Sequence, residues 1–356
     1  MSILVTGGSG FIGSNFILEW INKEDGLVIN LDKLTYAGNN YNLSSVENNN
    51  NYLFKHGDIG DRNLVFKILK EYKPKYIVNF AAESHVDRSI ENPDCFIKTN
   101  INGTFYLLNT VKEYWLSLNE IDKTFFRFLH ISTDEVFGSL NLTDSPFTEQ
   151  SCYQPNNPYS ASKASSDHLV RSFNKTYNLP VLTTNCSNNY GPFQFPEKLI
   201  PLVINNALEK KRLPIYGDGL QIRDWLYVKD HCSAIRKVLK RGLIGETYNI
   251  GGNNEKTNLE LVKLICNLLD EFKPLEQEKD LNHYEELIEY VQDRPGHDRR
   301  YVIDSSKIQK DLGWNPSETF ESGIKKTVLW YLSNLDWVNN VKNANYLNWV
   351  KNHYKS

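Results

Sequence analysis

The sequence predicts an α/β fold, a doubly wound parallel sheet of the Rossmann type joined to a smaller mixed α/β substrate domain. Short, almost continuous apolar strands alternate with helical segments in the first half of the chain, which is typical of a parallel sheet covered on both faces. A glycine-rich turn follows the first strand, and an acidic residue ends the second. The length of 356 residues fits roughly two domains.

The strands and helices are expected to follow in a regular order. A strand over residues 3–6 leads into a turn over 7–13 and a helix over 15–22. The further strands are expected over residues 27–31, 76–80, 126–132, 181–185 and 246–250, and the further helices over 62–72, 97–116 and 159–177. After Pro192 the alternation is lost, because prolines interrupt the pattern until about residue 246. Residues 1–190 are therefore expected to form the doubly wound domain, re-entered by later segments, and residues 191–356 mainly the substrate domain and C-terminal helices.

Composition and charge exclude several classes of protein. The chain has 40 Lys and Arg against 43 Asp and Glu, a net charge of −3, which argues against a generally basic nucleic-acid binder. No stretch approaches the length of about eighteen apolar residues that a membrane span needs, and the N-terminus lacks a signal-peptide pattern. The five cysteines include no CxxC pair, so neither a disulfide scaffold nor a zinc knuckle is expected. We expect a reduced, cytoplasmic protein that binds no membrane, nucleic acid or metal.

The glycine-rich turn predicts a dinucleotide site. Gly7, Gly10 and Gly13 lie between a strand and a helix, and Asp32 closes the second strand. The first glycine permits the tight turn, the second lets the backbone approach a diphosphate, and the third lets helix and strand pack closely. Asp32 is placed to bind the adenosine ribose hydroxyls and to disfavour a 2′-phosphate, which favours NAD over NADP. The alternative is a glycine-rich turn without a ligand.

A tyrosine and a lysine predict a proton-transfer site. Tyr159 and Lys163 are four residues apart and share one face of the helix that they open. A phenol has a pKa of about 10 in water and is a poor base, but a nearby ammonium and a positively charged nicotinamide favour the phenolate. The structural alternative is an aromatic residue and a lysine that are neighbours on an amphipathic helix.

Two adjacent carboxylates provide an independent signal. Asp134 and Glu135 follow Thr133 where a strand runs into its loop, and open α/β sheets bind ligands at the carboxyl ends of their strands. Carboxylates with different surroundings hold different protonation states, so one acts as an acid and the other as a base. The structural alternative is an acidic pair that stabilises a helix N-terminus.

Taken together, these motifs make the chain resemble the extended, sugar-nucleotide branch of the short-chain dehydrogenases/reductases, and more narrowly the dTDP-glucose 4,6-dehydratases. The resemblance covers nearly the whole chain. Its motifs are the glycine turn, DKLTYAG at 32–38, GDI at 57–59, FAAESHVDRS at 80–89, STDEVFG at 132–138, Tyr159 with Lys163, CSNNYGP at 186–192, FPEKLIP at 195–201, PIYG at 214–217, RDW at 223–225, YNIGG at 248–252 and DRPGHD at 293–298. The Thr-Asp-Glu triplet is the more specific part, because related 4-epimerases usually carry small hydroxyl residues at positions 134 and 135.

The resemblance implies a reaction. Tyr159, assisted by Lys163 and Thr133, takes the proton of the glucose 4-hydroxyl while C4 gives a hydride to NAD⁺. Glu135 abstracts the C5 proton, Asp134 protonates the departing 6-hydroxyl, and the hydride returns to C6 to give the 4-keto-6-deoxy sugar nucleotide. An acid and a base are both needed in one closed site, which explains both carboxylates.

The resemblance also implies the binding residues. For NAD they are Gly7, Gly10, Phe11, Ile12, Gly13, Asp32, Lys33, Leu34, Thr35, Asp58, Ile59, Ala81, Ala82, Ser84, Thr99, Tyr159, Lys163 and Asn189. For the nucleotide sugar they are Ser84, Thr133, Asn188, Lys198, Leu199, Pro214, Ile215, Tyr216, Arg223, Asn258, Asp293, Arg294 and His297. The two arginines suit a diphosphate, although a single arginine is most often a surface ion-pair partner. The helices that begin near Ile97 and Tyr159 pair across a homodimer in this superfamily.

Three alternatives stay open at this point. One is a sugar-nucleotide 4-epimerase, and another is a 4,6-dehydratase of a different nucleotide sugar, since one methyl of thymine is worth only about 1–3 kcal/mol. The third is a non-catalytic NAD-binding scaffold, which would not need the proton-transfer residues. The use of the product, in rhamnose or another deoxysugar, is not visible in the sequence. The tail with Trp330, Trp337 and Trp349 is expected to pack as helix against the body.

Overall fold

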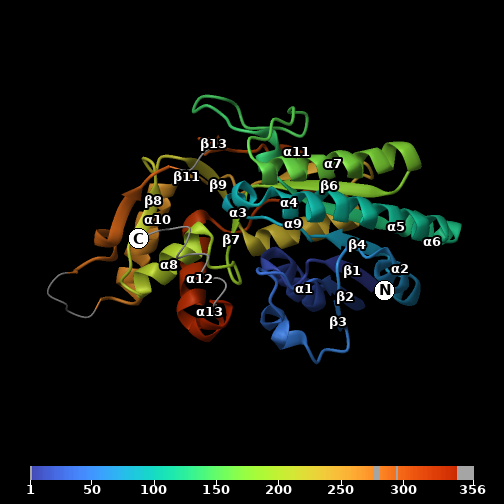
Figure 1. The fold of residues 1–356 in the computed structure, drawn as a ribbon, viewed down its shortest axis with the longest axis horizontal. Helices are drawn as coiled ribbons and strands as arrows, with labels where there is room; N and C mark the ends of the chain where they lie inside the picture. Colours follow the sequence, from blue (N-terminus) through green and yellow to red (C-terminus); the bar gives the residue numbers. More distant parts are fainter. Residues whose placement is uncertain (1, 276–280, 294–295, 343–356) are drawn as a thin grey trace.

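The computed structural model describes residues 2–275, 281–293 and 296–342, and its largest element is a seven-stranded sheet (Figure 1). The strands lie in the order β10-β6-β5-β4-β1-β2-β3, and each neighbouring pair is parallel. They are β1 (Ser2–Thr6), β2 (Leu27–Asp32), β3 (Tyr52–His56), β4 (Tyr76–Asn79), β5 (Arg127–Thr133), β6 (Val181–Cys186) and β10 (Thr247–Ile250). The predicted doubly wound parallel sheet is confirmed.

Helices cover both faces of this sheet because successive strand residues point to opposite sides. Ile3 and Val5 of β1 pack into a core with α1 and α9, whereas Leu4 packs into a second core with α2, α5 and α7. The helices are α1 (Phe11–Lys23) and α9 (Val228–Arg241) on one face, and α2 (Arg62–Tyr72), α5 (Thr104–Leu116) and α7 (Pro158–Tyr177) on the other. Inner strands such as β4 and β6 are thus buried on both faces, which explains their almost continuous apolar runs, whereas the edge strand β3 is only partly buried.

The predicted helix starts differ from the observed ones at two places. Helix α1 begins at Phe11 rather than at residue 15, because the glycine turn ends at its N-cap, Gly10. The segment predicted as one helix over 97–116 opens with a π-helical stretch, η2 (Ile97–Gly103), and continues as α5. Helix α7 agrees with its prediction, since Asn157 caps it and the left-handed Asn178 ends it.

The predicted loss of regular strand–helix alternation after Pro192 is confirmed, since two strands follow one another there, but the prolines do not prevent helices and strands from forming. The chain continues through α8 (Leu199–Leu208), β8 (Leu213–Tyr216), β9 (Ile222–Tyr227) and α9 to β10. Pro201 lies in the first turn of α8, where a missing N–H costs nothing, and Pro214 lies in β8, which pairs only with β12. Strand β10 pairs with β6, so the chain returns to the large sheet.

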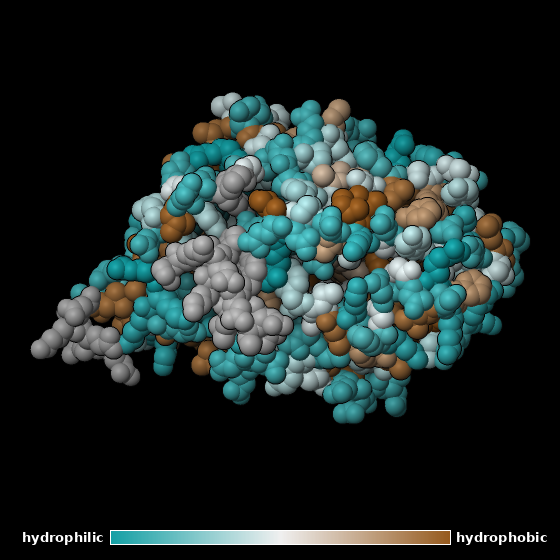
Figure 2. Space-filling view, viewed as in Figure 1, coloured by the Kyte–Doolittle hydropathy of each residue, from teal (hydrophilic) through white to brown (hydrophobic). Residues whose placement is uncertain are grey.

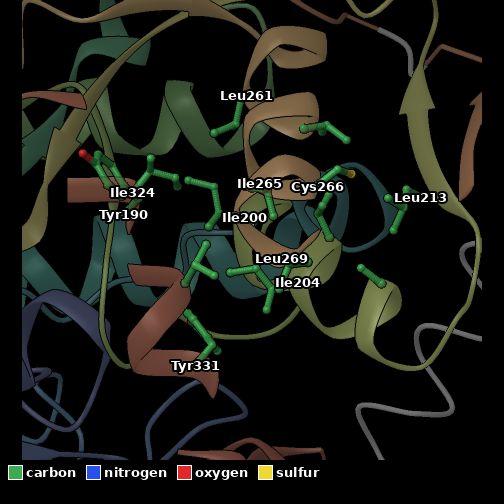
Figure 3. Packing of buried hydrophobic residues seen from close by; sticks show 14 of the residues in the cluster. Tyr190, Ile200, Ile204, Leu213, Leu261, Ile265, Cys266, Leu269, Ile324 and Tyr331 are labelled. Atoms are coloured by element: carbon green, nitrogen blue, oxygen red, sulfur yellow. The ribbon is translucent and has the colours of Figure 1, made fainter. Parts of the chain in front are cut away.

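The remaining residues build a smaller unit beside the carboxyl ends of the large sheet, drawn on the left of Figure 1. Its strands are β7 (Asn188–Tyr190), β8, β9, β11 (Glu255–Thr257), β12 (Ile288–Val291) and β13 (Arg300–Tyr301), and its helices are α8, α10 (Asn258–Phe272), α12 (Phe320–Ser333) and α13 (Leu335–Val341). Figure 3 shows buried side chains of this core, among them Tyr190, Ile200, Ile265, Leu269, Ile324 and Tyr331.

The aromatic tail packs as predicted in its described part. Trp337 of α13 is buried, and its indole N–H donates to the Asn42 side-chain oxygen at 2.7 Å. The Trp330 ring lies 4.9 Å from that of Phe193. Trp349 lies outside the described residues.

The short elements complete the chain. They are η1 (Asn40–Val46), α3 (Val86–Glu91), α4 (Pro93–Phe96), α6 (Glu120–Phe125), η3 (Asp134–Phe137), η4 (Tyr284–Leu287) and α11 (Ser306–Leu312). Within the described ranges, no helix has the length and apolar character required to cross a membrane.

Candidate active site

A cleft of about 300 Å³ opens at the carboxyl ends of the parallel strands, where open α/β sheets bind ligands. Most of the predicted site residues line it. They are Gly7, Gly10, Phe11, Ile12, Gly13, Asp32, Lys33, Thr35, Asp58, Ile59, Ala81, Ala82, Ser84, Thr99, Thr133, Asp134, Glu135, Tyr159, Lys163, Asn188, Asn189 and Lys198. The predicted cofactor residues, the carboxylate pair and the Tyr–Lys pair therefore share one cleft.

The glycine turn leaves no room for side chains at two of its three positions. Gly7 has a positive φ of 70°, and a Cβ there would lie 2.6 Å from the Ala81 nitrogen. A Cβ on Gly13 would lie 2.4 Å from the Gly7 carbonyl oxygen, whereas a Cβ on Gly10 would lie 3.4 Å from the same oxygen. No side chain caps the N-terminus of α1, so its first N–H groups and its dipole are available to an anion.

A Gly13→Ala substitution tests this close packing. We expect it to lower the free energy of unfolding by about 1–3 kcal/mol, because the helix must move away from the strand to admit the methyl group. The matched control is Gly10→Ala, whose methyl group has space, and which should change stability less. Urea unfolding of both proteins without added nucleotide makes the comparison, and equal stabilities would contradict the packing argument.

Asp32 ends β2 beside the glycine turn. Its carboxylate accepts the Ser9 N–H at 2.9 Å and the Leu34 N–H at 2.8 Å. Burial raises the pKa of Asp32, and these two N–H groups oppose the shift. Lys33 forms a 2.8 Å ion pair with Asp58. The backbone thus fixes Asp32 facing the turn, as a ribose-binding carboxylate requires.

The residues predicted to transfer protons come from the end of β5 and the start of α7. The Thr133 hydroxyl lies 3.4 Å from an Asp134 carboxylate oxygen and accepts the Glu135 N–H at 3.3 Å. The Ser160 hydroxyl donates to Glu135 at 3.3 Å, which joins this loop to α7. The Lys163 ammonium donates to the Ile131 carbonyl oxygen at 2.7 Å.

Burial and charge set the protonation of these groups. Burial raises the pKa of Asp134 well above its usual value, and the nearby Glu135 and Asp224 raise it further. A raised pKa favours the protonated form of Asp134, which can donate a proton. Burial likewise raises the pKa of Tyr159, with Glu135 adding to the shift, so the phenol is protonated unless a positive charge comes close. Burial lowers the pKa of Lys163.

Several predicted substrate residues do not line the cleft. These described residues are Leu199, Pro214, Ile215, Tyr216, Arg223, Asn258, Asp293 and His297, and the predicted cofactor residue Leu34 is also outside. Arg294 lies outside the described residues. The structure still gathers some of them in the smaller unit: the His297 imidazole lies 2.6 Å from Asp293 and edge-on to the Tyr216 ring.

Arg223 is buried beside the cleft rather than in its wall. Its guanidinium donates to the Asp298 carbonyl oxygen at 2.9 Å and lies 4.4 Å from the centre of the Tyr301 ring. Its positive charge opposes the raised pKa of Asp134, so it acts on the carboxylate pair electrostatically.

The cleft also has lining residues that were not predicted from the sequence. They are Leu31, Ala37, Gly38, Gly57, Phe80, Glu83, Ile131, Ser132, Cys186, Ser187, Gln194, Phe195 and Glu197. Glu197 is buried and accepts the Arg88 side-chain N–H at 3.0 Å. The FPEK motif contains this residue, and its position next to Lys198, a predicted substrate residue, could have indicated from the sequence that it lines the cleft. Cys186 is a buried thiol whose pKa is raised by burial, in agreement with a small packing residue rather than a nucleophile.

Among the described residues, no three His, Cys, Asp or Glu side chains are grouped as ligands.

Comparison with known proteins places this arrangement in a family. The family described as GDP-mannose 4,6 dehydratase matches residues 4–327. A dTDP-glucose 4,6-dehydratase of Xanthomonas campestris pv. campestris is 59% identical over 344 residues, which is 96% of each chain. A crystal structure of the dTDP-glucose 4,6-dehydratase of Bacillus anthracis in complex with NAD has a TM-score of 0.84 and 48% identity, and it matches 96% of this chain and 100% of its own.

A second crystal structure agrees. The dTDP-glucose 4,6-dehydratase of Streptomyces venezuelae, with NAD bound, has a TM-score of 0.86 and 43% identity over 96% of this chain and 100% of its own. A chain that matches these proteins from end to end, with the carboxylate pair and the Tyr–Lys pair in one cleft, belongs to the dTDP-glucose 4,6-dehydratase family.

Proposed function

We propose that this protein converts dTDP-glucose to dTDP-4-keto-6-deoxyglucose by removing water, with NAD as its resident cofactor. The observation that carries the proposal is the pair Asp134 and Glu135 in the same cleft as Tyr159 and Lys163. Water loss needs an acid and a base beside the oxidising group, and the raised pKa of Asp134 suits the acid. The relatives that match along the whole chain carry the same named activity.

The residues that line the cleft are suited to binding NAD. The crowded Gly7 and Gly13 bring backbone close to where a diphosphate would lie, and Asp32 would bind the adenosine ribose. A 2′-phosphate would meet the Asp32 carboxylate, which disfavours NADP. When bound, NAD accepts a hydride from C4 of the sugar and returns one to C6.

The protein's own groups move the protons. Tyr159 takes the proton of the 4-hydroxyl, aided by the Thr133 hydroxyl and the Lys163 ammonium. Glu135 takes the C5 proton, which the 4-ketone has made acidic, and later returns a proton to C5. Asp134 gives its proton to the 6-hydroxyl as water departs. Each step uses a residue that lines the same cleft.

The binding of the nucleotide part extends from the cleft toward the smaller unit. Ser84, Asn188 and Lys198 line the cleft on that side, and the Lys198 ammonium donates to the Ser84 carbonyl oxygen at 2.9 Å. Residues 1–190, with the returning α9 and β10, would hold NAD, and most of residues 191–356 would hold the nucleotide sugar. The product, a 4-keto-6-deoxy sugar, is a precursor type for rhamnose and other deoxysugars.

A mass spectrum of dTDP-glucose after incubation with the purified protein tests the proposal, with and without added NAD⁺. We expect loss of one water and no net reduction of the cofactor. An unchanged mass with a galactose-configured product would instead make the protein an epimerase. A reaction only with UDP-, CDP- or GDP-linked hexoses would mean that the substrate is a different nucleotide sugar. No reaction with any of these compounds would indicate a protein that binds NAD without catalysis.

We also propose a homodimer through α5 and α7, in the cytoplasm. The helices α5 and α7 pack side by side, where the Phe105 ring lies 6.3 Å from that of Phe173. Ile97, Phe105 and Tyr106 are exposed on this side by more than 40% of their surface, and Figure 2 shows apolar atoms over α4 and α5. An exposed apolar patch of this kind is typical of an interface.

A Phe105→Glu substitution is expected to turn a dimer into a monomer, because it places a charge in the apolar contact. The control is Leu243→Glu, an apolar side chain that is more exposed than Phe105 and follows the C-terminal end of α9. Light scattering during gel filtration measures both masses. A Phe105→Glu protein that kept the mass of a dimer would exclude this interface.

A further inference from the structure

Helix α7 carries a third polar residue on the face of the Tyr–Lys pair. Tyr159, Lys163 and Asp167 are spaced four residues apart, so they lie along one side of the helix, and all three are buried. A buried carboxylate needs donors to offset its loss of water. Asp167 does not line the cleft, so its contacts show what it does.

Three side chains from other elements converge on one oxygen of Asp167. Its Oδ2 accepts the hydroxyl of Ser132 at 2.7 Å, the hydroxyl of Tyr153 at 3.0 Å and the amide of Asn185 at 3.5 Å. The same Asn185 amide donates to the Thr133 carbonyl oxygen at 3.0 Å. Asp167 therefore connects α7 to the last residues of β5 and β6, beside the loop that carries the carboxylate pair.

The other oxygen of Asp167 faces His130. Its Oδ1 lies 3.4 Å from the His130 Nε2. The Asn79 side-chain oxygen accepts the Thr6 hydroxyl at 2.6 Å, which leaves the Asn79 amide to donate to the His130 Nδ1 at 3.1 Å. The His130 Nε2 then carries the hydrogen of the neutral ring. Burial and the charge of Lys163 lower the pKa of His130, so the imidazole is neutral.

Asp167 follows Lys163 by one turn of α7 on the same side of the helix, so the two side chains are neighbours. Burial lowers the pKa of Lys163, and among the charges that oppose this shift Asp167 has the largest effect. The other titratable groups that face Lys163 are Tyr159 on its own helix, His130 on β5 and Cys186 on β6. His130 is neutral, and burial raises the pKa values of Tyr159 and Cys186, which keeps both uncharged.

We propose that Asp167 is a positioning residue of the reaction: its fixed carboxylate is the counter-ion that keeps the Lys163 ammonium charged beside Tyr159. The hydroxyls of Ser132 and Tyr153 hold the carboxylate in place, so the charge acts from one fixed position. A charged Lys163 favours the Tyr159 phenolate, and a neutral Lys163 does not. The role in catalysis rests on the proposed dehydratase function, whereas the charge of Lys163 can be measured without turnover.

The experiment compares Asp167→Asn, which keeps the shape and removes the charge, with Asp167→Glu, which keeps the charge. NMR of protein labelled with ¹³C at the lysine Cε gives the pKa of Lys163, and a Lys163→Met protein assigns its signal. We expect this pKa to fall by at least about one unit in Asp167→Asn. It should stay near the unsubstituted protein's value in Asp167→Glu. A pKa unchanged in Asp167→Asn would overturn the proposal.

The pH profile of kcat/KM gives the second readout. The alkaline limb should move to lower pH by on the order of one unit in Asp167→Asn, with KM changed less than kcat. The matched control is Tyr153→Phe, which removes one hydrogen bond to Asp167 and no charge, and its limb should not move. A limb that moved equally in Tyr153→Phe would make Asp167 a structural residue only.

Folding and function are separated within the same set of proteins. If Asp167→Asn does not fold, both measurements are made on Asp167→Ser. Serine leaves space for a water among the same donors, and we expect the same shifts in the Lys163 pKa and in the pH profile. Failure of the proposed function appears as an unsubstituted protein without water loss, and the NMR measurement still decides the charge of Lys163.

Discussion

A Tyr159→Phe protein should oxidise the sugar at C4 about 10²–10⁴-fold more slowly while still binding the sugar nucleotide. In the proposed reaction the Tyr159 phenolate takes the 4-hydroxyl proton and becomes the phenol, and phenylalanine keeps the ring without the hydroxyl. Stopped-flow absorbance of reduced nicotinamide measures the first step, and calorimetry measures binding.

The matched control is Tyr190→Phe. Tyr190 is also buried, but it lies in the core of the smaller unit, with its hydroxyl 3.5 Å from the Phe320 carbonyl oxygen. Its substitution should leave C4 oxidation within about tenfold of the original rate, because one weak hydrogen bond contributes about 1 kcal/mol. Normal oxidation by Tyr159→Phe would remove Tyr159 from its assigned role.

Asp134→Asn and Glu135→Gln should show the opposite pattern. C4 oxidation should proceed in both, and water loss should slow by about 10²–10⁴-fold, so reduced nicotinamide accumulates on mixing with substrate. The reason is that these two residues act only after the 4-ketone has formed. Absorbance follows the cofactor, and mass spectrometry follows the loss of water.

Exchange of the C5 proton in D₂O distinguishes the role of Glu135 from that of Asp134. Glu135→Gln should not exchange the C5 proton of the bound 4-keto sugar, because its base is gone, whereas Asp134→Asn should still exchange it. Asp144→Asn, an exposed carboxylate in the next loop, is the control and should behave as the unsubstituted protein. If Tyr159→Phe, Asp134→Asn and Glu135→Gln all lost C4 oxidation equally while folded and bound to substrate, the division of roles would be wrong.

Much of the fold and the centre of the site could be predicted because their signals are local. Strand β1, the turn from Gly7 to Gly13 and Asp32 follow one another within a few dozen residues, and their order alone indicates a βαβ unit. The spacing of Tyr159 and Lys163 is a property of one helix, and the Thr-Asp-Glu triplet is continuous in the sequence. The periodicity that predicts strands and helices is likewise local.

The helices and strands of the second half of the chain were harder to predict, because a proline in the sequence does not show whether it lies at the end of a helix or strand or in a loop. Pro201 and Pro214 lie in a first helical turn and in a strand with one partner, positions that only pairing and packing reveal. The return of β10 to the large sheet beside β6 depends on contacts between segments far apart in the chain.

The sequence by itself determined the doubly wound sheet and the glycine turn with its acidic partner, and it named the residues proposed for proton transfer. Only the tertiary structure decided how those residues are charged. The fold buries Asp134 near Glu135 and Asp224, which raises its pKa, and it buries Asp167 one helical turn from Lys163 among residues of β5 and β6. Burial and charge depend on distances between atoms that are remote in sequence, and these distances exist only once the chain has folded.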